Sequence, residues 1–127
     1  MKNILIVDDD RDVFESMKIV LESEGYAVEW ATNGNEALEK VRARKPDLMI
    51  LDVMMNTDDE GFQVTYKMKH DGDLATVPII MVTSIGARTG FSFDKRRDED
   101  FLPVNEFLEE PVDPKVLVDK VRENLGH

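Results

Sequence analysis

The chain contains no cysteine, which excludes disulfide bridges, thiolate metal sites and catalysis by a thiol. It also lacks any apolar run near the roughly 20 residues that a membrane-spanning helix needs. The opening MKNILIVDDD does not predict a signal peptide, because acidic residues follow its apolar run too soon. Together these absences favour a cytoplasmic protein without a membrane partner.

Basic residues are scarce relative to acids. Lys and Arg number 16 against 27 Asp and Glu, which gives a formal net charge of −11 over 127 residues. Binding to a nucleic-acid backbone depends on clustered Lys and Arg, so this balance disfavours a nucleic-acid partner. No linker, repeat or low-complexity segment divides the chain, and we expect residues 1–127 to form one domain.

Short apolar runs alternate with amphipathic stretches along the chain. Strands are predicted at 4–7, 26–30, 48–51, 77–82 and 107–108, and helices at 11–24, 34–44, 61–70 and beyond a cap at Asp113. This order predicts a doubly wound α/β fold, with helices on both faces of a parallel sheet. We expect five strands in the flavodoxin-like order 2-1-3-4-5, with the mixed 26–30 strand at an edge.

Residues 84–103 break this alternation. They occupy the place of the fourth helix, yet they contain two glycines, no clean helical period and a dense run of charge. We therefore expect a short or irregular fourth helix and an exposed loop.

Acidic residues follow several of the predicted strands. Asp8 and Asp9 end the first strand, and Asp52 ends the third. Parallel strands bring these ends to one edge of the sheet, where ligands bind. Two carboxylates about 4 Å apart repel by about 4 kcal/mol at an effective dielectric constant of about 20. A hard divalent cation offsets this repulsion, and an oxygen-only set favours Mg²⁺ over zinc.

A simpler interpretation is that each acid only caps the helix that follows it, as Asp commonly does. That interpretation suits one acid better than a set of acids after two buried strands. A carboxylate beside Mg²⁺ can also attack a phosphoryl group and form an acyl phosphate. A hydroxyl such as that of Thr83, after the fourth strand, can donate to a phosphoryl oxygen.

These segments make the chain resemble the receiver domains of two-component response regulators, over essentially its full length. The matching segments are ILIVDD (4–9), LDVMM (51–55), the Gly61-Phe62 pair, PIIMVTS (78–84) and NEFLEEPVDP (105–114). The resemblance implies a phosphoacceptor that signals through protein–protein contacts and is not a turnover enzyme. It also implies a sensor histidine kinase or phosphotransfer protein as one partner and an unknown downstream protein as another.

The resemblance also assigns roles to individual residues. Asp52 would accept the phosphoryl group. Asp9, Asp52 and the backbone carbonyl of Met54 would bind Mg²⁺, and Asp8 would hold a metal-bound water. Thr83 and Phe107 would form the hydroxyl and aromatic switch pair, and Pro111 is a candidate for a cis peptide bond.

One position departs from the family pattern. Receivers carry a Lys before the proline that follows the fifth strand, and this chain has Glu110 there. The domain could still accept phosphate on Asp52 but couple it poorly to the switch, which is the account we favour. A basic residue from the 84–103 stretch (Arg88, Lys95, Arg96 or Arg97) could replace the Lys. Alternatively, the chain could be a pseudo-receiver that binds a partner without phosphotransfer.

A different class of protein shares one local pattern. Asp8 and Asp10 have the D-x-D spacing of haloacid dehalogenase-type phosphatases, and MVTS (81–84) resembles their second motif. No Lys ends a predicted strand, however, and Asp52 would have no role in such an enzyme. No output domain is expected within the 127 residues, so a receiver of this kind would act through a partner.

Overall fold

Five parallel strands form one sheet in the computed structural model, which describes residues 2–52, 60–72, 74–83, 106–109 and 113–125. The spatial order is β2-β1-β3-β4-β5, as predicted. The strands are β1 (Asn3–Val7), β2 (Ala27–Ala31), β3 (Leu48–Asp52), β4 (Ile79–Thr83) and β5 (Glu106–Glu109). The mixed strand predicted at 26–30 corresponds to β2, and it does lie at an edge.

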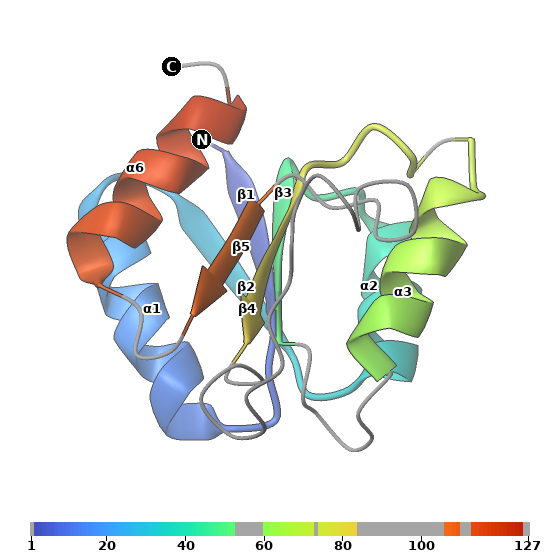
Figure 1. Ribbon diagram of the computed structural model, residues 1–127, viewed down its shortest axis with the longest axis horizontal. Coiled ribbons are helices and arrows are strands. Elements are labelled where there is room, and N and C mark those ends of the chain that lie inside the picture. Colours follow the sequence, from blue (N-terminus) through green and yellow to red (C-terminus); the bar gives the residue numbers. More distant parts are fainter. Residues whose placement is uncertain (1, 53–59, 73, 84–105, 110–112, 126–127) are drawn as a thin grey trace.

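Helices cover both faces of the sheet (Figure 1). They are α1 (Arg11–Ser23), α2 (Gly34–Ala43), α3 (Glu60–Lys69) and α6 (Pro114–Leu125). α1 and α6 lie on one face, and α2 and α3 lie on the other. The predicted doubly wound architecture is therefore confirmed, and the predicted helices 11–24, 34–44 and 61–70 start and end within one residue of the observed bounds.

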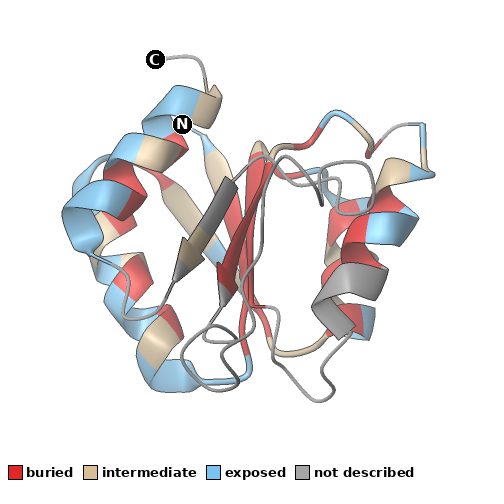
Figure 2. Ribbon diagram, viewed as in Figure 1, coloured by how far each residue is buried: buried red, intermediate tan, exposed pale blue. Residues whose placement is uncertain are grey.

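The core is split in two by the alternation of side chains along the central strands. Ile4 and Ile6 of β1 pack in the cluster that contains buried residues of α1 and α6. Leu5 and Val7 pack in the cluster that contains buried residues of α2 and α3. A strand buried on both faces must be apolar at every position, which explains the continuous run ILIV. Figure 2 shows this burial through the middle of the sheet.

Helix α1 begins and ends at residues suited to those positions. Asp10 caps its N-terminus, where one side-chain oxygen accepts hydrogen bonds from the backbone N–H groups of Asp12 and Val13. Gly25 follows its C-terminus with φ of 92°. The N–H of Gly25 donates to Glu22, and the N–H of Tyr26 donates to Leu21, which is the Schellman arrangement. These bonds direct the chain into β2.

Helix α6 starts as the sequence predicts. The Asp113 carboxylate accepts a hydrogen bond of 2.8 Å from the N–H of Lys115, and Pro114 occupies the first helical position. The predicted irregular fourth helix at 84–103 lies outside the described residues. Within the described ranges, no helix is long and apolar enough to cross a membrane.

Replacing Gly25 by Ala should destabilise the fold by about 1–2 kcal/mol, because an L side chain is strained at this positive φ. A Cβ at Gly25 would have no atom within 4 Å, so the effect comes from the backbone alone. Gly72 offers a matched control, because it has the same open space and no positive φ. Denaturant unfolding should show Gly72→Ala within about 0.5 kcal/mol of the natural chain. Equal losses in the two variants would contradict this account.

Candidate functional site

The register of the two central strands brings their terminal acids to the same level. Val7 of β1 pairs with Leu51 of β3, and each is followed by an aspartate, Asp8 and Asp52. Both acids are buried, with 1% and 8% of their surface exposed, whereas Asp9 is exposed. One carboxylate oxygen from each of Asp8, Asp9 and Asp52 lies within 4.8 Å of the others. The structure therefore brings together the three acids that the sequence singled out.

This donor set fits a hard divalent cation. Mg²⁺ binds oxygen at about 2.0–2.1 Å, so two of its ligands are at most about 4.2 Å apart. The observed spread of up to 4.8 Å requires only a small side-chain adjustment to reach that range. Three carboxylate ligands would leave other coordination positions of the cation open to water or to a phosphoryl oxygen. Asp8, Asp9 and Asp52 are thus the described residues that could hold the metal.

Asp10 has a different function from its neighbours. Its carboxylate caps α1, through bonds of 2.9 and 3.3 Å to the N–H groups of Asp12 and Val13. The Asp8 carboxylate in turn accepts a 2.8 Å hydrogen bond from the N–H of Asp10. The helix-capping interpretation is therefore correct for Asp10, and Asp8 both stabilises the turn and belongs to the acid cluster.

Trp30 contacts the same turn, and the sequence did not single it out. Its indole Nε1–H donates a 2.8 Å hydrogen bond to the backbone carbonyl of Asp8. Its ring stacks on Phe14 of α1, with centroids 4.7 Å apart and planes 7° apart. Trp30 is the only tryptophan of the chain and lies on the edge strand. The need of a half-buried indole N–H for an acceptor was the one available signal.

The remaining predicted site residues are only partly described. Thr83 ends β4, and Phe107 pairs with Met81 along β5; the positions of their side chains are not described. Met54, Glu110, Pro111 and the basic residues Arg88, Lys95, Arg96 and Arg97 lie outside the described residues. The roles expected of these residues therefore stay predictions.

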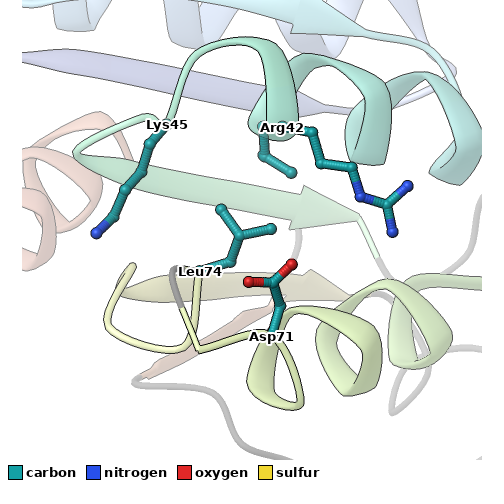
Figure 3. A pocket seen from close by; sticks show the side chains of 5 residues that line it. Arg42, Lys45, Asp71 and Leu74 are labelled. Atoms are coloured by element: carbon teal, nitrogen blue, oxygen red, sulfur yellow. The ribbon is translucent and has the colours of Figure 1, made fainter.

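A cavity of about 350 Å³ lies where α2 ends, near the amino-terminal ends of the strands and away from the acid cluster (Figure 3). Val41, Arg42, Lys45, Asp71 and Leu74 line it, and Figure 3 shows Arg42 and Lys45 on either side of Leu74. The Lys45 ammonium donates to the Thr76 hydroxyl at 3.2 Å. Because α2 runs from the carboxyl edge of the sheet to the amino edge, these cations are remote from the acid cluster.

Comparisons with known sequences agree with this geometry. The chain belongs to the response regulator receiver domain family, whose pattern matches residues 4–122. Protein PilH of Pseudomonas aeruginosa is 31% identical over 126 residues, which cover 99% of each chain. Response regulator MprA of Mycobacterium leprae is 43% identical over 110 residues. That match covers 84% of this chain and 46% of MprA, so the chain spans less than half of this relative.

Solved structures show the same similarity. The CheY-like receiver domain protein of Methanospirillum hungatei JF-1 has a TM-score of 0.83 and 31% identity, over 98% of this chain and 94% of that chain. Chemotaxis response regulator CheY4 of Vibrio cholerae has a TM-score of 0.83 and 27% identity, over 98% of each chain. The chain is accordingly a phosphoacceptor receiver domain of two-component signalling, from a family that binds Mg²⁺ at an acidic pocket.

Removing one acid should have opposite effects with and without Mg²⁺. In a chelator, Asp9→Asn should raise the unfolding midpoint, because it relieves repulsion from Asp8 and Asp52. With Mg²⁺ at about a hundred times its dissociation constant, the natural chain should gain about 2.7 kcal/mol and the variant much less. Thermal unfolding in the two buffers measures both effects.

Glu39→Gln supplies the control for this experiment, because Glu39 is an exposed acid in the middle of α2. Its Mg²⁺-dependent gain should equal that of the natural chain. An equal gain for Asp9→Asn would show that Asp9 does not contribute to metal binding.

Proposed function

We propose that Asp52 is the phosphoryl acceptor of this receiver domain. The observation that carries the proposal is the placement of Asp52, which ends the central strand β3 with its carboxylate in reach of both Asp8 and Asp9. Asp9 and Asp52, with the Met54 carbonyl, would bind Mg²⁺ directly, and Asp8 would act through a water. Asp9 is exposed and Asp8 is buried, which supports access to the site from the side of Asp9.

The reaction is a transfer of a phosphoryl group between two proteins. A carboxylate oxygen of Asp52 attacks phosphorus, the bond from phosphorus to the donor nitrogen breaks, and the donor histidine recovers a proton. Bound Mg²⁺ offsets the negative charge of both the carboxylate and the phosphoryl oxygens. Asp52 is 8% exposed, so most of its surface is covered by protein, which supports a role for the protein in orienting its carboxylate.

The backbone supports a role for Thr83 as the hydroxyl that senses the phosphoryl group. Asp52 pairs with Val82, so Thr83 lies one residue farther along the neighbouring strand, toward the acid cluster. Its hydroxyl donates to a phosphoryl oxygen and moves toward it. Phe107 of the adjacent β5 is the aromatic partner that follows this movement of Thr83. Signalling then proceeds through a changed protein-binding surface.

Glu110 sets how well this switch works. A carboxylate replaces the ammonium that would pair with the phosphoryl dianion, which removes an attraction and adds a repulsion. We propose that Asp52 still accepts phosphate but that the phosphorylated form is coupled poorly to the switch. In a second account, a basic side chain from Arg88 or residues 95–97 pairs with the phosphoryl group in place of the Lys. A pseudo-receiver, which binds its partner without phosphotransfer, is the alternative that Glu110 favours.

The contacts of Asp10 disfavour the phosphatase alternative. It requires Asp10 as a partner of Asp8, but the Asp10 carboxylate is engaged by the first turn of α1. Instead, we propose a phosphorelay role for residues 1–127 as one receiver unit. Its donor is a sensor histidine kinase or a phosphotransfer protein, and its output is contact with a downstream protein, without nucleic-acid or membrane binding.

Phosphorylation can be tested by intact-mass measurement after incubation with Mg²⁺ and a small phosphoramidate. The natural chain should gain about 80 Da, the mass of one phosphoryl group, and Asp52→Asn should gain nothing. Asp10→Asn is the matched control from the same cluster of acids, because Asn preserves the helix cap. It should still be phosphorylated. A natural chain that no donor phosphorylates would favour the pseudo-receiver.

The role of Glu110 is tested by reversing its charge. Glu110→Lys should speed phosphorylation of Asp52 by about tenfold or more, because about 1.4 kcal/mol of electrostatic stabilisation corresponds to tenfold in rate. Glu109→Lys makes the same charge change one residue earlier and should have a much smaller effect. Time-resolved mass measurement gives the rates. Equal rates in the two variants, or a Glu110→Lys rate equal to that of the natural chain, would contradict a repulsive effect of Glu110 on phosphoryl transfer.

A further inference from the structure

The turn that carries Asp8, Asp9 and Asp10 is fixed from three directions. The Asp8 N–H donates to the Ala31 carbonyl at 3.0 Å, which extends the β1–β2 ladder by one bond. The Asp10 N–H donates to the Asp8 carboxylate at 2.8 Å. The third anchor is the indole N–H of Trp30, which reaches the Asp8 carbonyl at 2.8 Å. Two of the three anchors therefore come from the end of β2.

The third anchor acts on the peptide group that joins Asp8 to Asp9. This group is planar, so holding its carbonyl in place restricts the rotation of the Asp8–Asp9 peptide and the position from which the Asp9 side chain extends. Among the described residues, no hydrogen bond or ion pair holds the Asp9 carboxylate. The placement of this exposed acid depends on the backbone beneath it, unlike that of Asp10, which the helix cap holds.

The indole itself is held in place. Its ring stacks on Phe14, which is 8% exposed and belongs to the inward face of α1. Trp30 also pairs with Ile6 in the β1–β2 register, one residue before the strand ends. Because the ring and the backbone are both fixed, the N–H is directed at the Asp8 carbonyl without further ordering.

We propose that Trp30 is a positioning residue for cation binding, which acts through its hydrogen bond to the Asp8 carbonyl. It holds the Asp8–Asp9 peptide so that the Asp9 carboxylate stays in reach of the Asp8 and Asp52 oxygens. The inference rests on the proposed function, since it requires that these acids bind Mg²⁺. A purely structural role for Trp30 would depend on the ring and its stacking alone.

The single tryptophan allows these roles to be separated. Replacing it biosynthetically with β-(3-benzothienyl)alanine preserves the shape of the ring and removes the N–H donor, and Trp30→Phe removes the donor by mutation. Both should weaken Mg²⁺ binding by about tenfold in calorimetry, as loss of an outer-sphere hydrogen bond to a metal site commonly does. Phe14→Leu disrupts the stack but keeps the donor, and should stay within about twofold of the natural chain.

A second measurement follows the N–H directly. The one indole resonance of the natural chain should shift on addition of Mg²⁺, and it should stay unmoved in Asp52→Asn. The role of Trp30 would be overturned if the benzothienylalanine protein bound Mg²⁺ with the affinity of the natural chain. It would also be overturned if the losses of Mg²⁺ affinity in Trp30→Phe and Phe14→Leu were proportional to their losses of stability. A natural chain that binds no Mg²⁺ would contradict the proposed cation site itself, and the inference with it.

Discussion

The pairing of Val7 with Leu51 determines the chemistry of this protein. A parallel register places the next residue of each strand at the same level, and here both residues are aspartates. Both carboxylates are held near this end of the sheet, because Asp8 directly follows β1 and Asp52 ends β3, and both strands are almost wholly buried. The apolar residues that stabilise the sheet therefore also hold like charges together. This is a stable arrangement only with a cation or strong hydrogen bonds nearby.

Three consecutive aspartates resolve this crowding in three different ways. Asp10 turns toward the N-terminus of α1, where the helix dipole favours negative charge. Asp8 is buried and accepts the N–H of Asp10, so part of its charge is stabilised by the backbone. Asp9 remains exposed and available. The same residue type thus serves as a helix cap, as a turn anchor and as a candidate metal ligand, according to which backbone groups surround it.

Most of the fold could be predicted from the sequence because its signals are local. The continuous run ILIV, the helical stripe that stops at Gly25 and the Asp113-Pro114 start are each written in neighbouring residues. The convergence of Asp8, Asp9 and Asp52 followed from one general property of parallel sheets. Trp30 was missed, because its hydrogen bond joins residues 22 positions apart and depends on the pairing of β2 with β1. The capping role of Asp10 was one of two open interpretations, and only side-chain geometry could separate it from Asp8.

The cations beside the cavity at the end of α2 have a wider electrostatic consequence. Lys40, Arg42, Arg44 and Lys45 gather near the amino edge of the sheet, whereas Asp8, Asp9, Asp10 and Asp52 gather at the carboxyl edge. Among these eight side chains, positive charge therefore lies toward one end of the strands and negative charge toward the other. In the field of a positively charged partner, this local separation of charge favours an approach in which the acidic end of the sheet faces the partner.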